Sequence, residues 1–179
     1  MKAWIFDDLP GDQRAPHNSG DSSPVDLAAL AKLGLLAKSD VDMDAVEVVV
    51  KERNYKNRDV IKVSKEGLGD LYESKLLGFF REHMHEDEEI RYIQEGEGYF
   101  DVRDSTDARW IRVSMLPGDL LVLPAGIYHR FTLTDSNYVQ ALRLFKDEPK
   151  WIPYDRSTET DANPYRKEYV EEVLKPLAA

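Results

Sequence analysis

Two stretches decide the expected fold of this chain, HMHEDEE at residues 83–89 and GDLLVLPAGIYHRF at residues 118–131. Alternate side chains of a β-strand share one face of the sheet. His83, His85 and Glu89 have the same parity, so all three can project from one face. The acidic residues between them suit the opposite, solvated side or a turn. The first stretch therefore predicts a strand that carries three potential metal ligands.

The second stretch supplies a fourth potential ligand. Pro124 and Gly126 indicate a turn, and His129 begins the strand that follows it. If the strands close into a barrel, this strand can lie beside the first. Three imidazoles and one carboxylate suit iron(II), nickel, manganese or zinc. An octahedral ion held by four such ligands keeps two positions open for a chelating substrate, whereas a structural zinc site is closed and tetrahedral.

The chain around these stretches is rich in short β-type segments. Six runs rich in β-branched and aromatic residues are separated by turn signals, which predicts an antiparallel sandwich or barrel. The short connections exclude parallel crossovers. The predicted strands are residues 89–95, 98–104, 109–115, 119–125, 128–134 and 138–145.

Helices are expected on both sides of this region. Residues 24–82 are predicted to be largely helical, with one helix opening at Ser22, Ser23 and Pro24 and others at residues 42–53 and 66–82. A last helix is predicted at about residues 164–176, with Pro164 near its start. We thus expect a mainly β protein with one domain over residues 1–179, a barrel core at about 83–145 and flanking α-helices.

Composition excludes several classes of protein. A length of 179 residues suits one domain, and the formal net charge of -10 disfavours nucleic acid and anionic membranes as partners. The absence of cysteine excludes disulfides and thiolate sites. No run approaches the roughly 20 apolar residues of a membrane span. We expect a cytoplasmic protein whose small size leaves nuclear entry open, and a monomer, because no coiled-coil heptads are visible.

The two stretches resemble the paired motifs of the cupin superfamily. The first motif has HxH, then a glutamate, then a glycine, and the second has a glycine, PxG and a histidine. Gly78 corresponds to the leading glycine of the first motif but lies one residue closer to His83 than usual. Leu133 stands where the second motif usually has an asparagine. Neither departure touches a potential ligand. The matching residues are His83, His85, Glu89, Gly96, Gly118, Pro124, Gly126 and His129.

Longer stretches are similar to one cupin family, the acireductone dioxygenases of the eukaryotic type. The similarity runs over nearly the whole chain and is weakest at residues 36–52 and 155–165. The stretches that carry it are EEIRYIQEGEGYFDVRD, WIRV, LPAGIYHRF, ALRLFKDEPKW, AWIFDD and RAPH.

This resemblance implies a reaction. The family cleaves an acireductone, a 1,2-dihydroxy-3-keto compound with a methylthio group, by means of O2 in methionine salvage. With Fe(2+) it makes 4-methylthio-2-oxobutanoate and formate, and with Ni(2+) it can make 3-methylthiopropanoate, formate and CO. The expected partners are therefore a small molecule and O2. Two alternatives stay open, namely another cupin enzyme and a non-enzymatic cupin that binds ligands or proteins.

Further site residues follow from parity and resemblance together. Arg91 shares a face with Glu89 and is expected to serve the substrate. Arg143 lies among apolar residues of its strand, where it needs either a bound anion or an internal salt bridge. Phe79 and Phe131 resemble the aromatic residues that flank the family's pocket, although such residues are often core. His17 lies in a loop and is left out of the site.

Overall fold

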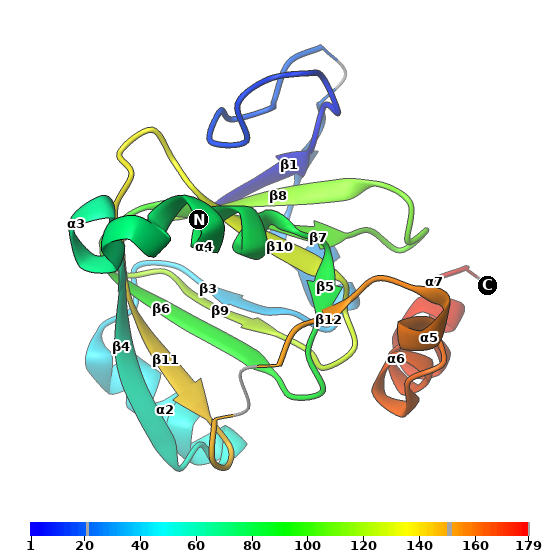
Figure 1. Ribbon diagram of the computed structural model, residues 1–179. Coiled ribbons are helices and arrows are strands. Elements are labelled where there is room, and N and C mark those ends of the chain that lie inside the picture. Colours follow the sequence, from blue (N-terminus) through cyan, green and yellow to red (C-terminus); the bar gives the residue numbers. More distant parts are fainter. Residues whose placement is uncertain (21, 150–151, 179) are drawn as a thin grey trace.

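The computed structural model describes residues 1–20, 22–149 and 152–178, which include two antiparallel sheets (Figure 1). The larger sheet has seven strands in the order β12-β5-β10-β7-β8-β1-β2, and the smaller has five in the order β3-β9-β6-β11-β4. The strands are β1 (Lys2–Ile5), β2 (Pro24–Val25), β3 (Leu36–Lys38), β4 (Asn57–Val63), β5 (His83–Met84), β6 (Glu89–Gly96), β7 (Gly98–Arg103), β8 (Trp110–Met115), β9 (Leu120–Leu123), β10 (His129–Leu133), β11 (Val139–Phe145) and β12 (Tyr154–Asp155). The prediction of a mainly β, antiparallel fold is confirmed.

The six predicted strands are present as β6 to β11. Buried side chains from both sheets form one apolar cluster, because the inner faces of the two sheets meet. Burial of this apolar surface is the main favourable contribution to folding. Members from the smaller sheet and then the larger one include Ile93, Leu121, Val139, Phe100, Val102 and Val113.

The prediction of a largely helical region at residues 24–82 is wrong in part, because β2, β3 and β4 lie within it. Strand β4 occupies the edge of the smaller sheet, where it pairs with β11. Its residues alternate between more exposed and less exposed positions, as expected of a strand with one solvated face. Strands β2 and β3 have only 2 and 3 residues, too few to show a periodic pattern.

Two helix boundaries also differ from the prediction. Helix α1 (Leu27–Lys32) begins after the cap Asp26 instead of at Ser22 to Pro24, because Pro24 and Val25 pair with β1. The helix predicted at 66–82 is divided into α3 (Lys65–Leu68), a 3-10 turn η1 (Gly69–Leu71) and α4 (Tyr72–Phe80). Gly69 has a φ of +53°, which ends α3.

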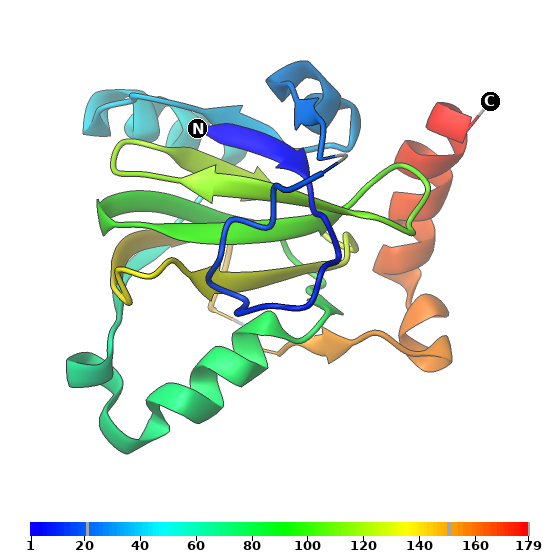
Figure 2. The same cartoon turned by 90° about the horizontal axis from the view of Figure 1, so that it is seen from above.

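The other predicted helices are confirmed. Helix α2 (Met43–Arg53) begins after the cap Asp42 and packs its valines on the outer face of the smaller sheet. The C-terminal segment forms α5 (Thr158–Asp161), α6 (Pro164–Tyr169), the π-helix η2 (Val170–Leu174) and α7 (Lys175–Ala178). Figure 2 shows α4 and this C-terminal segment on different sides of the sheets. Within the described residues, no helix combines the length and the hydropathy needed to cross a bilayer.

A buried ion cluster ties the N-terminal loop to the larger sheet. Arg112 donates from Nε and Nη2 to both carboxylate oxygens of Asp101 at 2.7 and 2.9 Å, and Arg130 donates to the same carboxylate at 2.8 Å. Arg112 and Asp101 are 0% and 1% exposed. Arg112 also donates to the carbonyls of Gln13 and Ala15. One carboxylate therefore compensates two guanidinium groups.

Replacing Asp101 by Asn should strongly destabilise the fold, because a buried and a half-buried arginine would lose the anion that they share. The expected loss in the free energy of unfolding is about 3–5 kcal/mol, as found when one partner of a buried pair is removed. Urea unfolding followed by circular dichroism measures it. Asp147→Asn is the control, since its pair with Lys56 is exposed and surface pairs contribute little. Equal stability of the two variants would contradict the assignment.

Candidate metal centre

The four predicted ligands lie where the chain passes from one sheet to the other. His83 lies in β5 and is the register partner of His129, which begins β10 of the same sheet. His85 follows β5, the chain bends at residues 86–87, and Glu89 begins β6 of the smaller sheet. The expectation that a single strand presents His83, His85 and Glu89 is thus wrong. The bend in the chain, and not the parity of one strand, brings these three side chains together.

The ligand atoms of these four side chains converge. One nitrogen or oxygen from each of His83, His85, Glu89 and His129 lies within 4.8 Å of the others. Oε2 of Glu89 is 3.0 Å from Nε2 of His85 and 2.9 Å from Nε2 of His129. His83 and His129 are buried, and the other two are half-buried. The structure therefore gathers the whole predicted set around one point.

The protonation of the three rings is set by the backbone. In each ring, Nδ1 lies within hydrogen-bonding distance of a carbonyl oxygen, which can only accept, so Nδ1 carries a proton. In the neutral ring, Nε2 then keeps its lone pair, the form that binds metals. The acceptors are the carbonyls of Arg81, Ile152 and Ile127, at 2.7, 2.9 and 3.0 Å from Nδ1 of His83, His85 and His129 respectively.

The charges at the site favour a cation. Burial, together with the neighbouring His129, lowers the pKa of His83 to about 4, so its ring is neutral at pH 7. Burial alone would raise the pKa of Glu89, but the positive charge of Arg91 and the contacts with His129 and His85 outweigh it and hold that pKa well below its usual value. Imidazole lone pairs and a carboxylate that point at one another repel unless a positive charge lies between them. This donor set fits a divalent ion.

Two arginines lie beside this cluster. Arg91 pairs through Nη2 with Oε1 of Glu89 at 2.8 Å. Arg143 donates from Nε and Nη2 to the two oxygens of Asp59 at 2.7 and 2.8 Å. Arg91 and Arg143 are register partners on β6 and β11, and both line the same cavity. Of the two alternatives for Arg143, the structure contains the internal salt bridge.

A cavity of about 720 Å³ opens on the four ligands. Phe79 from α4 and Phe131 from β10 both line it, with ring centroids 6.2 Å apart in an edge-to-face arrangement. The cavity therefore joins a polar end, with the histidines and arginines, to an apolar wall. The remaining apolar lining comes mainly from Ile61, Val63, Ile93, Phe100, Val139 and Ala141.

Sequence reasoning missed two contributors to this site. Asp59 lies in β4, and the alternation of that strand was the signal that could have placed it opposite Arg143. Ile152 contributes only its backbone carbonyl, for which a sequence carries no signal. His17, which was left out, contacts Asp7 at 2.9 Å and the Asp12 carbonyl at 3.0 Å, and it does not line the cavity.

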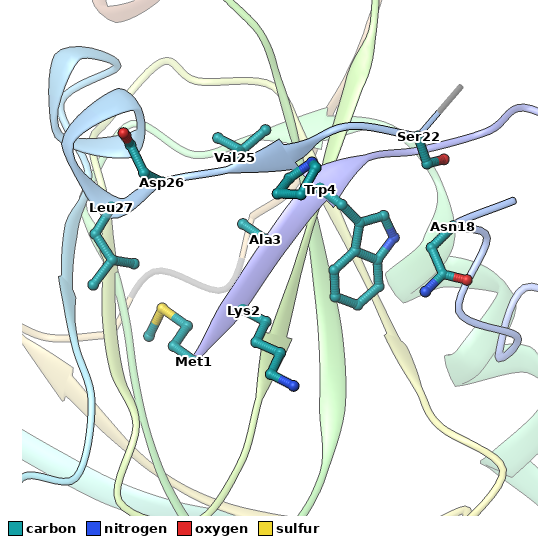
Figure 3. A pocket seen from close by; sticks show the side chains of 10 residues that line it. Met1, Lys2, Ala3, Trp4, Asn18, Ser22, Val25, Asp26 and Leu27 are labelled. Atoms are coloured by element: carbon teal, nitrogen blue, oxygen red, sulfur yellow. The ribbon is translucent and has the colours of Figure 1, made fainter. Parts of the chain in front are cut away.

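A second hollow of about 510 Å³ lies at the outer edge of the larger sheet, near β1 and β2 (Figure 3). Its described lining contains Trp4 and the charged residues Lys2 and Asp26, but none of the eight predicted site residues. The chemistry therefore belongs to the cavity between the sheets.

This chain is similar in sequence to proteins named acireductone dioxygenase. An "Acireductone dioxygenase 1" of Coprinopsis cinerea is 57% identical over 176 residues, which are 97% of this chain and 98% of that protein. An "Acireductone dioxygenase" of Neurospora crassa is 56% identical over 178 residues, which are 99% of this chain and 98% of that protein. A solved structure is described as an acireductone dioxygenase from Bacillus anthracis with a cadmium ion in its active centre. It has a TM-score of 0.67 to this chain at 24% identity, and the match covers 85% of this chain and 96% of that chain. This similarity supports the fold.

The family assignment rests on the sequence as well as on the fold. Residues 2–153 match the family described as ARD/ARD'. This range includes every predicted ligand, Arg91 and Arg143. The chain belongs to the ARD/ARD' family.

Proposed function

We propose that this protein is an iron(II)-dependent acireductone dioxygenase. The observation that carries the proposal is the convergence of three imidazoles and one carboxylate beside a cavity that contains arginine. The relatives that cover almost all of the chain bear the same name. The substrate would be 1,2-dihydroxy-3-keto-5-methylthiopentene, an electron-rich enediol.

The reaction is balanced with O2 as the only co-reactant. The carbon–carbon bond between C1 and C2 of the substrate breaks, and each of these carbons gains one oxygen atom. The products are 4-methylthio-2-oxobutanoate and formate. The enediol is oxidised and O2 is reduced, so no further reductant is needed.

In this proposal His83, His85, Glu89 and His129 hold the metal. A bound divalent ion supplies Lewis acidity that stabilises the enediolate and makes its carbons reactive toward O2. The backbone carbonyls at Nδ1 keep the three rings in the orientation and tautomer that expose Nε2. Arg91 holds the Glu89 carboxylate and places positive charge at the polar end of the cavity.

The other cavity residues select and orient the substrate. Asp59 fixes the guanidinium of Arg143 by two hydrogen bonds, so its charge stays at one position in the cavity wall. Phe79 and Phe131 offer an apolar surface to the methylthio end and exclude water from the polar end. The cavity thus matches a ligand with one anionic, oxygen-rich end and one apolar end.

The metal sets the product in this proposal. With nickel the same site would give 3-methylthiopropanoate, formate and CO. The iron reaction regenerates the 2-oxo acid precursor of methionine, which places the enzyme in methionine salvage. We further propose a monomer that acts in the cytoplasm, with a size small enough to leave entry into the nucleus open.

An assay with defined metals tests the function. Metal-free protein reconstituted with iron(II) and mixed with a synthetic acireductone should consume one O2 per substrate and release formate and the 2-oxo acid. Nickel-loaded protein should release CO. Product analysis by mass spectrometry and gas detection checks both outcomes. No consumption of O2 above the uncatalysed rate with either metal would refute the proposal.

Loss of one ligand should abolish metal binding. Glu89→Gln removes the only negative ligand, and His85→Ala removes one nitrogen. Both variants should contain far less iron than the wild type after reconstitution and desalting, as measured by elemental analysis. Asp87→Asn is the matched control, because this exposed acid lies in the same bend. If Glu89→Gln kept the full iron content, Glu89 would not be a ligand.

Arg91→Leu should reduce turnover by roughly tenfold or more at saturating iron, since a hydrogen bond to a charged group contributes about 1.5–3 kcal/mol. Because Arg91 also contacts Glu89, the variant should bind iron more weakly. Arg91→Lys keeps the charge and should recover part of the turnover. O2 consumption at several iron concentrations separates the two effects. Unchanged turnover in Arg91→Leu would remove this residue from the mechanism.

A further inference from the structure

Helix α6 packs on the turn between β9 and β10, which contacts two of the proposed ligands. This turn contains Gly126, whose N–H donates to the carbonyl of His85 at 3.0 Å. The next residue, Ile127, offers its carbonyl to Nδ1 of His129 at 3.0 Å. The two peptide groups that flank the Gly126–Ile127 peptide therefore hold the backbone of one ligand and the ring of another. Any shift of this turn would move both ligands.

The close approach of α6 explains why this position is glycine. Gly126 has a φ of +81°, which side chains rarely adopt. A Cβ at Gly126 would also collide with the backbone carbonyl of Tyr165 in α6. The turn and the helix are thus in direct backbone contact, without side chains between them.

Arg166 of α6 fixes this contact. Its Nη1 donates to the carbonyl of Gly126 at 3.0 Å, and its Nη2 donates to Asp107 at 2.6 Å. The residue is 3% exposed, and its guanidinium lies 4.3 Å from the ring centroid of Tyr128. Burying a guanidinium is costly unless its donors are satisfied. This one is directed at the carbonyl of Gly126, in the peptide group that lies between the two that hold His85 and His129.

The chain just before α5 holds His85 by a second route. Nδ1 of His85 donates to the carbonyl of Ile152, just before β12. Strand β12 then pairs with β5, placing Tyr154 opposite Met84 and Asp155 opposite His83. Figure 1 shows β12 leading from this pairing into α5 and α6. The part of the chain that matches the family ends at residue 153, so α6 lies beyond it.

We propose that Arg166 is a positioning residue of the metal centre, which acts through the Gly126 turn on His85 and His129. This inference rests on the proposed metal site. If Arg166 had a structural role alone, it would attach α6 to Asp107 and contribute to stability, with no separate effect on metal affinity.

Cobalt(II) titration of the metal-free protein distinguishes the two roles, because cobalt absorption reports both affinity and ligand geometry. Arg166→Lys keeps a charge for Asp107 but cannot also reach the Gly126 carbonyl as the planar fork does. We expect its cobalt affinity to fall by about 10–100-fold, the usual effect of removing an outer hydrogen-bond partner of a ligand, and its absorption spectrum to change.

Tyr128→Phe is the matched control. It keeps the ring beside Arg166 but removes the hydrogen bond from the Tyr128 hydroxyl to Asp161, 2.6 Å long. It loosens the same C-terminal segment without touching Gly126. Its melting temperature should fall, while its cobalt affinity and spectrum stay those of the wild type. Wild-type affinity and spectrum in Arg166→Lys would overturn the inference, as would parallel losses of affinity and stability in both variants.

A second variant covers the case in which Arg166→Lys does not fold. Asn163 caps α6 at the N–H of Tyr165 and donates to Glu86, the residue after His85, at 2.9 Å. Asn163→Ala should lower the affinity for cobalt, as Arg166→Lys is expected to do. Unchanged affinity would overturn the inference. Failure of the wild type itself to bind cobalt would instead refute the proposed metal site, and the inference with it.

Discussion

The candidate metal centre depends on the close approach of three imidazole nitrogens and one carboxylate oxygen. Such groups repel each other when only lone pairs meet, so their convergence has to be imposed by the rest of the chain. The bend at residues 86–87 and the pairing of His83 with His129 impose it from the backbone. The carbonyls at Nδ1 then remove the remaining rotational freedom of the rings. The fold thus holds the four ligand atoms in positions where only a cation or a proton can remove their mutual repulsion.

Much of this arrangement could be predicted from residue types and spacing. The six strands between residues 89 and 145 show clear β-type runs with turn signals, and His129 follows a recognisable turn. The grouping of His83, His85 and Glu89 was also predicted, but for a reason that the structure does not support. Their equal parity suits a strand, whereas the chain bends between His85 and Glu89.

The parts that could not be predicted share a physical origin. Strands β2, β3 and β12 are too short for a periodic pattern, and each forms by pairing with a strand that is distant in the sequence. The carbonyl of Ile152 holds His85, but every residue has a carbonyl. The salt bridge between Asp59 and Arg143 needs the register of β4 with β11, which depends on packing across the whole edge of the sheet. The local sequence does not determine strand pairing and register between segments that are distant in the chain.

The position of the ligands in both sheets has a thermodynamic consequence. His83 and His129 belong to the larger sheet, and Glu89 belongs to the smaller one. An ion held by all three links the sheets and has no equivalent site in the unfolded chain. Its binding therefore adds to the free energy of unfolding, by about 2.7 kcal/mol when the free ion stands at one hundred times its dissociation constant. The lifetime of the folded protein is then coupled to metal supply, and metal starvation would lower stability as well as metal occupancy.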